Sequence, residues 1–566
     1  MNADSSASAT AADAVSAPLD MLLTAAAFGP ARWITPRAGA VRLTAAMATH
    51  PKLVAGRGWQ LLSELSRVTL GTSTLRPSRR DRRFADPGWT GNPLLRRSVQ
   101  AYLAAAQTAE SLVEEVGLEW ADTERARFAV RNLVDALAPS NNPVLNPAAW
   151  KAAIDTGGVS ALTGLRRLIS DLAAPPRVPS MVEPDAFEVG RDLAVTPGAV
   201  VLQTPVFELI QYSPATAKVR QAPLLIVPPT INKFYVLDLA PGRSLAEYLV
   251  SSGQQVFMIS WRNPDARYAR WDLDAYGQAV LDALDAVSRI TQCDQAALTG
   301  VCSGGIISAM VVAHLAQTGQ QDRIAAVTLL ASVLDQERAG LASAVIDERM
   351  AQAAAAASQA RGYLDGRSLA EVFAWLRPND LIWNYWVNNY LLGRPPPPFD
   401  ILFWNADTTR MTAGLHRDFL QLAVANALAK PGGATMLGSP VDLSLVDRDS
   451  YLVAGINDHI CPWQSCYRSA QMLGGSTRFV LSTSGHIAAM VNPPGNDKAS
   501  YQLAKETPAD PQGWLRQAET CSGSWWPDYT TWLAERCGPK KAAPRKLGGG
   551  GLTPQSAAPG TYVHDH

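Results

Sequence analysis

A short glycine-flanked cysteine motif constrains this 566-residue chain more than any other feature. Residues 296–299 form a run typical of a buried strand, Gly-Val-Cys-Ser-Gly follows at 300–304, and an apolar helical run comes next. Strand, sharp turn and helix in this order are the setting of a nucleophile elbow, whose small neighbours permit a strained central residue. Cys302 would present its sulfur at a helix start, where the helix dipole favours a thiolate. The pattern predicts Cys302 as a nucleophile; a small buried apolar cysteine is the alternative.

Short apolar runs recur on both sides of this motif. The strand-like runs lie at 199–202, 207–212, 224–227, 256–259, 296–299, 327–330, 451–454 and 478–481. Helical patterns at 243–252, 272–290 and 303–317 separate the four central runs. Such alternation indicates a parallel sheet covered by helices on both faces. The predicted fold class is α/β, specifically an α/β-hydrolase fold with a cap insertion and a helical N-terminal domain.

The pattern also divides the chain. We expect a disordered tail at 1–20, a helical domain at 21–184, a catalytic domain at 185–537 and a flexible, Gly-, Pro- and Lys-rich tail at 538–566. The strand and helix alternation stops at about 336–440, and this insertion is very rich in aromatic residues. The aromatic side chains are expected either to cap the site or to form the insertion's own core.

Composition excludes several classes of protein. Lys+Arg and Asp+Glu number 50 each, so no global field indicates a nucleic-acid partner. Six cysteines in so long a chain do not make a disulfide framework, and a reducing cytosol is the simplest compartment. Cys461 and Cys466 are too far apart for a Cys-x-x-Cys pair. No apolar run reaches the roughly 18 residues of a transmembrane segment, so contact with a hydrophobic phase is expected to be peripheral.

Two candidate partners for Cys302 follow the last two predicted strands. Asp458 comes shortly after the run at 451–454, and His486 shortly after the run at 478–481. Catalytic groups gather at the carboxyl ends of parallel strands, and the order nucleophile, acid, base is that of elbow hydrolases. We therefore predict that His486 takes the proton of Cys302 and that Asp458 orients the imidazole. For Asp458 the alternative is a simple turn former.

An oxyanion hole needs two backbone N–H groups aimed at one point. One donor is expected from Ser303, directly after the nucleophile, and the other from the loop at 228–233. This loop begins with two prolines, which have no N–H, so Thr230 or Ile231 must donate. The sequence leaves both open. A thiol suits exchange with a thioester, because each side of the exchange is a thioester, and transfer requires that water be kept out.

Several motifs together make the chain resemble a polyhydroxyalkanoate synthase over roughly residues 90–566. They are PPTINKFY at 228–235, SWRNP at 260–264, GVCSGG at 300–305, NDLIWNYW at 379–386, AGINDHI at 454–460 and SGHI at 484–487. The ending APGTYVH at 558–564 and the single-chain length resemble class II, which favours medium-chain monomers.

The resemblance implies an acyltransferase that adds the acyl unit of (R)-3-hydroxyacyl-CoA to a growing polyester and releases CoA. It implies that Cys302 carries the acyl chain and that His486 is its base, while Asp458 either orients His486 or activates the 3-hydroxyl. No metal or prosthetic group is needed. The implied partners are the acyl-CoA, the polyester and its granule surface, a second copy of the chain in a homodimer, and granule-associated proteins. The implied location is the cytoplasm, on polyhydroxyalkanoate granules.

Two other functions fit parts of this pattern. A thioesterase or depolymerase of the same fold would release only free acid, although serine is more usual at the elbow of a depolymerase. A non-catalytic granule-associated scaffold would be indifferent to the change Cys302→Ala.

Overall fold

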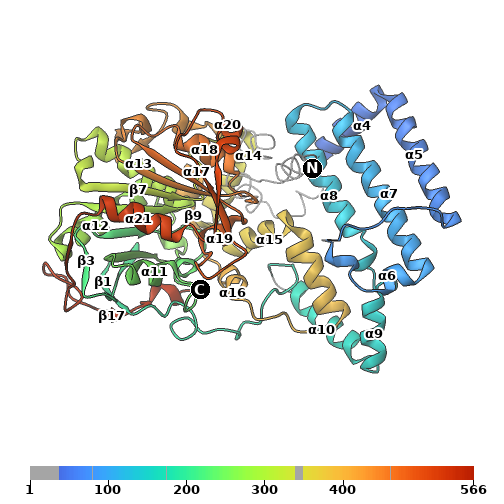
Figure 1. Ribbon diagram of the computed structural model, residues 1–566, viewed down its shortest axis with the longest axis horizontal. Coiled ribbons are helices and arrows are strands. Elements are labelled where there is room, and N and C mark those ends of the chain that lie inside the picture. Colours follow the sequence, from blue (N-terminus) through green and yellow to red (C-terminus); the bar gives the residue numbers. More distant parts are fainter. Residues whose placement is uncertain (1–36, 80, 174, 338–347, 459) are drawn as a thin grey trace. The chain divides into compact units, whose positions relative to one another are not determined.

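The computed structural model describes residues 37–566 except 80, 174, 338–347 and 459 (Figure 1). The chain forms two compact units. The sheet unit contains Pro184–Gly366 and Phe399–His566, and the helical unit contains the described part of Phe28–Glu183 together with Arg367–Pro398. The tail expected at 1–20 lies outside the described residues.

An eleven-stranded sheet with the order β15-β14-β13-β12-β7-β6-β4-β5-β2-β1-β17 organises the sheet unit. Its strands are β1 (Gly198–Gln203), β2 (Phe207–Tyr212), β4 (Leu224–Val227), β5 (Val256–Trp261), β6 (Ala296–Val301), β7 (Ile324–Leu330), β12 (Ser450–Gly455), β13 (Thr477–Ser482), β14 (Ser500–Leu503), β15 (Glu519–Ser522) and β17 (Ser556–Ala557). Neighbouring strands from β5 to β13 are parallel, and the outer ones are antiparallel. Every predicted strand run coincides with one of these strands, so the predicted parallel sheet is confirmed.

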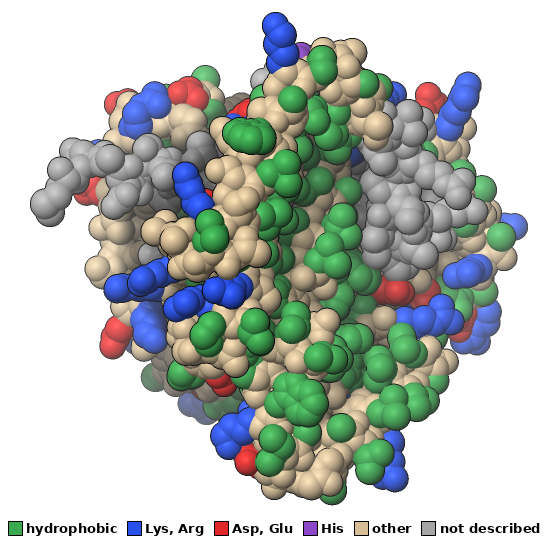
Figure 2. Space-filling view, turned by 90° about the vertical axis from the view of Figure 1, so that its right-hand side faces the viewer, with side chains coloured by type: hydrophobic (Ala, Val, Ile, Leu, Met, Phe, Trp, Pro, Cys, Tyr) green, Lys and Arg blue, Asp and Glu red, His purple; other side chains and the backbone are tan. Residues whose placement is uncertain are grey.

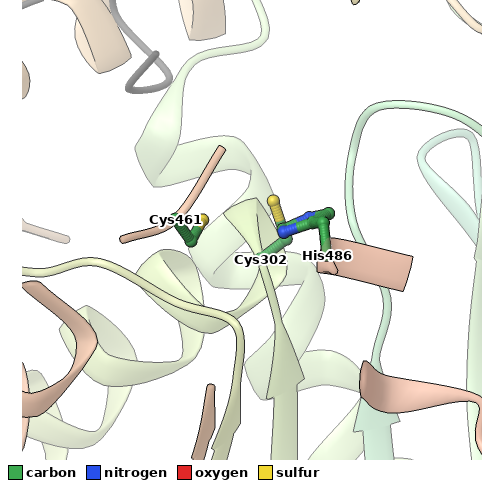
Figure 3. A group of neighbouring side chains, drawn as sticks. All are labelled: Cys302, Cys461 and His486. Carbon is green, nitrogen blue, oxygen red and sulfur yellow. The ribbon is translucent and has the colours of Figure 1, made fainter. Parts of the chain in front are cut away.

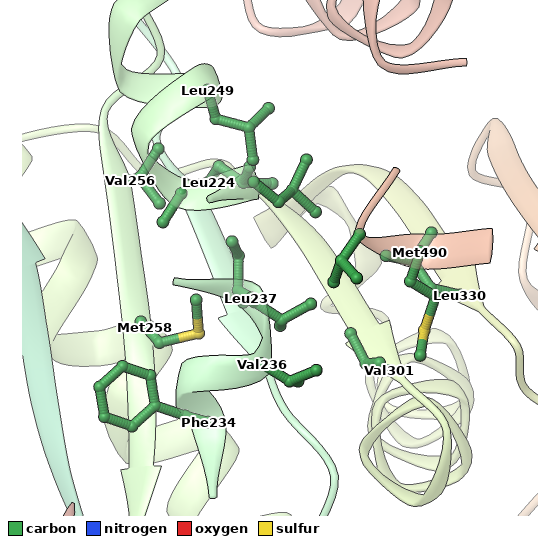
Figure 4. Packing of buried hydrophobic residues seen from close by; sticks show 14 of the residues in the cluster. Leu224, Phe234, Val236, Leu237, Leu249, Val256, Met258, Val301, Leu330 and Met490 are labelled. Atoms are coloured by element: carbon green, nitrogen blue, oxygen red, sulfur yellow. The ribbon is translucent and has the colours of Figure 1, made fainter. Parts of the chain in front are cut away.

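Helices cover this sheet because its strands are apolar on both faces. Alternate residues of the central strands, such as Leu224 and Val256, pack with Leu249 of α11 and the aromatic residues of α21 in one large core (Figure 4). The helices of the sheet unit are α11 (Leu245–Ser251), α12 (Leu273–Thr291), α13 (Ser303–Gln317), α14 (Glu348–Arg361), α16 (Asp400–Ala406), α17 (Ala413–Val424), α18 (Trp463–Ala470), α19 (His486–Met490), α20 (Pro511–Gln517) and α21 (Trp526–Arg536). Asp272 caps α12 by accepting the Ala275 N–H, which fixes where that helix begins.

The helical unit is built almost entirely from helices. They are α4 (Arg37–Thr49), α5 (Pro51–Leu70), α6 (Gly88–Gly91), α7 (Pro93–Glu115), α8 (Trp120–Ala136), α9 (Pro147–Asp155), α10 (Val159–Ala173), most of α15 (Gly366–Leu376), and the π-helical turns η6 (Asn379–Trp383) and η7 (Trp386–Leu391). Asn92 caps α7 and Asn146 caps α9, each followed by a proline at the first helical position. No helix among the described residues combines the length and the apolarity that crossing a bilayer requires.

The insertion expected at about 336–440 is divided between the two units. In the helical unit, the Trp383 ring contacts the rings of Trp375 and Trp386 edge-on. In the sheet unit, Trp404 lies in the main core. These aromatic residues therefore contribute to the cores of the two units rather than to a separate core of the insertion. Their role as a cap stays a prediction.

The C-terminal residues differ from expectation, because the segment expected to be a flexible tail at 538–566 is packed onto the sheet unit. Within it, β16 (Lys540–Ala542) pairs with β3 (Lys218–Arg220), and β17 pairs with β1. The fully buried Glu208 accepts the backbone N–H groups of Thr561 and Tyr562 at 2.9 and 3.0 Å. A Gly- and Pro-rich composition predicts mobility only where the backbone lacks partners, and here strand edges and a buried carboxylate provide them.

Candidate active site

Cys302 lies in the turn between β6 and α13, with φ 51° and ψ −119°. A positive φ is rare for a residue with a side chain and persists only where the surroundings enforce it. The Cys302 N–H donates to the Leu330 carbonyl at 2.9 Å, and the Cys302 carbonyl accepts the Gly305 N–H at 2.9 Å. The predicted strand, turn and helix around Cys302 are therefore present, and the neighbouring strand holds the turn in place.

Glycines allow this turn to close. A Cβ on Gly300 would lie 2.6 Å from the Gly305 Cα, and a Cβ on Gly304 would lie 2.3 Å from the Pro228 carbonyl oxygen. These obstacles are backbone atoms, which cannot move aside as a flexible side chain would. A Cβ on Gly305 would lie 1.9 Å from the Ser332 Oγ, so this third glycine, outside the pentapeptide, is required as well.

His486 and Asp458 meet beside this turn. His486 begins α19 after β13, and its Nδ1 lies 2.7 Å from the Asp458 Oδ2. The other carboxylate oxygen of Asp458 accepts the backbone N–H groups of Ile460 and Cys461 at 2.8 and 2.9 Å. The Asp458 side chain has no exposed surface, and that of His486 is 7% exposed. Both oxygens of Asp458 are therefore engaged within the protein.

A second sulfur joins this cluster. The Sγ atoms of Cys302 and Cys461 and a ring nitrogen of His486 lie within 4.8 Å of one another (Figure 3). Sequence reasoning weighed Cys461 only against Cys466 and missed this contact, because the loops after β6 and β12 meet only in the folded sheet. Two thiols and an imidazole could hold a soft metal ion, but such an ion would occupy the sulfur that the elbow presents.

The environment separates the pKa values of the two thiols. Hydrogen bonds from Cys461 and His486 and the charge of His486 lower the pKa of Cys302 to about 5, against the effect of burial. Burial alone would lower the pKa of His486, but the charge of Asp458 and hydrogen bonds to Asp458 and Cys302 raise it to about 10. The hydrogen bond to Cys302 and burial raise the pKa of Cys461 well above its usual value. Near neutral pH the cluster therefore holds a thiolate, an imidazolium and a neutral thiol.

Two of the three oxyanion-hole candidates, Thr230 and Ser303, lie in contact at the start of α13. The Thr230 N–H donates to the Ser303 hydroxyl at 2.9 Å. This bond occupies the Thr230 donor, which favours Ile231 among the two residues that the sequence leaves open. The Ser303 N–H contributes to lowering the pKa of Cys302, which places this donor beside the sulfur.

The loop that carries these donors is held by buried polar contacts. The Lys233 ammonium is 4% exposed, pairs with Asp407 at 2.8 Å and donates to the Val563 carbonyl at 2.6 Å. The Trp404 indole N–H donates to the Lys233 carbonyl at 2.7 Å. The C-terminal segment therefore contacts the loop at 228–233 directly, a role that a flexible tail would not have.

Comparisons with known proteins identify the family. The family described as "Poly-beta-hydroxybutyrate polymerase (PhaC) N-terminus" matches residues 80–249, and the alpha/beta hydrolase fold matches 223–493. Poly(3-hydroxyalkanoate) polymerases 2 and 1 of Ectopseudomonas oleovorans are 47% and 48% identical over 91% and 89% of this chain and 92% and 89% of their own lengths. The chain belongs to the poly(3-hydroxyalkanoate) polymerase family. The polymerase subunit PhaC of Cupriavidus necator is 40% identical over 89% of this chain and 85% of its own length.

The family confirms the resemblance to a class II polyhydroxyalkanoate synthase and makes this polymerase an enzyme of the acyltransferase class. It also confirms the α/β-hydrolase fold. Within that fold the polymerase carries Cys302 after β6, Asp458 after β12 and His486 after β13, the positions at which ligands gather in a parallel sheet.

Proposed function

We propose that this polymerase joins (R)-3-hydroxyacyl-CoA units into a polyester, with release of CoA, through covalent catalysis by Cys302. One observation carries the proposal: the Cys302 sulfur, in a strained elbow, lies within 4.8 Å of a ring nitrogen of His486, and a fully enclosed carboxylate binds this imidazole. The lowered pKa of Cys302 and the raised pKa of His486 favour a thiolate beside an imidazolium. A thiolate, unlike a thiol, is an effective nucleophile toward a thioester.

The acylation step uses this charge pair directly. The Cys302 thiolate attacks the thioester carbonyl of the acyl-CoA, and the N–H groups of Ser303 and Ile231 hold the developing oxyanion. The bond between the carbonyl carbon and the CoA sulfur then breaks, and the His486 imidazolium gives its proton to the departing CoA thiolate. One thioester replaces another, so the step is nearly balanced in free energy.

Chain extension follows from the protonation state that acylation leaves behind. Neutral His486 takes the proton from the 3-hydroxyl of the next unit as that oxygen attacks the acyl group on Cys302. An ester bond forms, the bond to the Cys302 sulfur breaks, and the thiolate and imidazolium are restored. Asp458 orients His486 in this scheme rather than activating the hydroxyl, because its oxygens are engaged and enclosed.

The assay for this proposal supplies (R)-3-hydroxyacyl-CoA and follows CoA and polymer together, with the mass of the Cys302 peptide measured in quenched samples. We expect polymer to accumulate with CoA and the Cys302 peptide to gain acyl units. CoA release with free acid alone would instead establish a thioesterase. In the variant His486→Gln, acylation is expected to slow by roughly 10²–10⁴-fold. An unchanged burst of CoA would remove His486 from the mechanism.

The helical unit carries a second proposal, that it docks on the polyester granule. Five large apolar residues of α10 are each more than half exposed, and they are spaced along one stripe of the helix: Val159, Leu162, Leu165, Ile169 and Leu172. On α9, Trp150 and Ile154 are 54% and 74% exposed. Hydrophobic side chains gather on the face of this unit that Figure 2 shows. We call these seven residues the apolar face.

The apolar face is not an unfilled gap in the packing of its own unit. The opposite side of α10 carries small residues, and a Cβ on Gly164 would lie 1.9 Å from the Tyr390 carbonyl oxygen. The Tyr390 hydroxyl donates to Asp171 at 2.6 Å. The helix therefore packs inward through its small residues and presents its large ones outward, the reverse of an ordinary amphipathic helix. An uncharged polyester surface suits such a face, and a second copy of the chain is the alternative occupant.

A further inference from the structure

Cys461 is a buried thiol that acyl transfer leaves unused. It lies on the loop between β12 and α18, and its backbone N–H donates to the Asp458 Oδ1 at 2.9 Å. The carboxylate that orients His486 through one oxygen therefore also fixes Cys461 through the other. As a result, the imidazole and the second thiol both lie close to the Cys302 sulfur (Figure 3).

The distance between the two sulfurs suits a reversible bond. The Cys302 and Cys461 sulfurs lie within 4.8 Å of each other, both as free thiols. A disulfide has an S–S length of about 2.05 Å, so the sulfurs must approach by at most about 3 Å. Side-chain rotation and a small shift of the connecting loop can supply such a movement.

The environments of the two sulfurs differ in the way that a redox pair requires. Cys302 is partly exposed and is held as a thiolate, the form that attacks a peroxide. Cys461 is only 6% exposed and stays a neutral thiol. A peroxide therefore reacts first with Cys302, and Cys461 is the adjacent thiol able to respond. Reversible redox sites combine an accessible low-pKa cysteine with a neighbouring resolving cysteine.

We propose that Cys461 is a resolving thiol, which forms a reversible disulfide with Cys302 after a hydroperoxide reaches the site. This disulfide stops polymerisation and protects Cys302 from irreversible oxidation. The loss of activity, though not the disulfide itself, rests on the proposed role of Cys302 as acyl carrier. In a reducing compartment such bonds are transient and serve sensing or catalysis rather than structure.

The chemistry takes two steps. The Cys302 thiolate attacks one oxygen of the hydroperoxide, the O–O bond breaks, and Cys302 becomes a sulfenic acid while hydroxide or alkoxide leaves. The Cys461 sulfur then attacks the Cys302 sulfur, the S–O bond breaks, and the Cys461 proton leaves with the hydroxyl group as water. A dithiol reductant reverses the sequence by thiol–disulfide exchange and is itself oxidised. An acyl chain on Cys302 blocks the first step, so the switch acts on the idle enzyme.

The experiment exposes the full-length enzyme to excess hydrogen peroxide, with and without acyl-CoA, and then divides each sample. One half is digested without reductant after free thiols are alkylated, and the other is treated with dithiothreitol and assayed for CoA release. In the wild type we expect one linked pair of peptides containing Cys302 and Cys461, and recovery of most of the activity with the reductant. Acyl-CoA is expected to reduce the linked fraction.

The variant Cys461→Ser keeps a hydroxyl donor near Cys302 but cannot form the bond. We expect it to recover a roughly tenfold smaller fraction of its own starting activity, with Cys302 oxidised to sulfinic or sulfonic acid. The matched control Cys466→Ser removes another buried thiol of the same segment and is expected to recover like the wild type.

Two results would overturn the inference. One is the absence of the linked pair in oxidised wild type, and the other is a Cys461→Ser enzyme that recovers as fully as the wild type. A linked enzyme that keeps polymerising would contradict the acyl-carrying role of Cys302 instead, so the two failures are distinguishable.

Discussion

Helices α13 and α10 are both 15 residues long and rich in apolar residues, yet they meet opposite surroundings. In α13 almost every residue is buried, from Ser303 onward. In α10 the buried residues are Ser160 and Gly164, and the large side chains are exposed. Apolar composition predicts that a helix will be covered, but not whether its own chain covers it. In α13 the cover comes from the sheet and α12, whereas the large side chains of α10 have no cover from the described residues of their own unit.

Both helices use small residues where a backbone comes close. At the start of α13, Gly304 leaves room for the Pro228 carbonyl oxygen, because it has no Cβ. The helix can therefore pack closely against the sheet. In α10, Gly164 admits the Tyr390 carbonyl, but the large residues lie on the other side. A glycine at a close backbone approach therefore shapes the turn at Cys302 in one unit and an exposed apolar surface in the other. Substitutions at the closely packed start of α13 should disturb catalysis and stability, and substitutions of the exposed large residues of α10 should disturb neither.

The largest expected effect comes from a change of Cys302, the residue directly before α13. Cys302→Ala removes the only atom that can carry the acyl chain in the proposed mechanism, so CoA release should fall by roughly 10⁴-fold or more. The fold should survive, because the change removes one sulfur from a partly exposed position. Turnover and thermal unfolding measured together check this. The matched control is Cys293→Ala, also a partly exposed thiol, and it should keep full turnover.

The next effect tests the close approach at the start of α13. Gly304→Ala places a Cβ 2.3 Å from the Pro228 carbonyl oxygen, so we expect a loss of about 1–3 kcal/mol in the free energy of unfolding and reduced turnover. Gly58→Ala in α5 is the matched control, because nothing lies within 4 Å of its added Cβ. This second change should leave stability equal or raise it by up to about 1 kcal/mol. Equal destabilisation by both variants would contradict the contrast between the two units.

A smaller effect concerns the charge state at the elbow. The thiolate of Cys302 is lost as pH falls through about 5, and the imidazolium of His486 is lost as pH rises through about 10. Alkylation of Cys302 by iodoacetamide should therefore be half-maximal near pH 5 and roughly tenfold faster at pH 6 than that of a thiol with the usual pKa.

A variant of His486 tests the direction in which this residue shifts the pKa of Cys302. His486→Gln removes the positive charge beside the sulfur, so the midpoint for alkylation of Cys302 should move to higher pH. Cys461, whose pKa is raised, should stay unmodified throughout this range. A midpoint near the usual cysteine value in the wild type would contradict the charge pair.

Position along the chain predicted the sheet unit well, and for a physical reason. A strand buried on both faces must be a continuous apolar run, and the residues that gather ligands in a parallel sheet follow such runs directly, as the candidates Asp458 and His486 do. The contact of Cys461 with Cys302 was not predicted, because it joins two loops that only the strand order brings together. The packing of the C-terminal segment was not predicted, because its partners, such as Glu208, lie far away in the sequence. The exposure of the large residues of α10 could not be predicted either, since an apolar stripe in a sequence does not reveal what covers it.

The smallest expected effect on catalysis, and the most informative about α10, comes from the double variant Leu162→Gln, Leu165→Gln. Both side chains are more than half exposed, so turnover on dispersed acyl-CoA and thermal stability should be unchanged. Binding to isolated polyester granules should fall several-fold to roughly tenfold, because each leucine loses the part of its burial free energy that docking would supply.

The double variant Leu94→Gln, Leu133→Gln is the matched control for that experiment, since these leucines are 74% and 60% exposed on α7 and α8. It should bind granules like the wild type. Equal loss in both variants would mean that any exposed leucine suffices, and unchanged binding in the α10 variant would remove the apolar face as the docking site. Sedimentation of both variants separates the granule from a second copy of the chain. If the α10 variant alone dissociates from dimer to monomer while still binding granules, the apolar face is a subunit interface, and its exposed leucines are covered by another polymerase rather than by polyester.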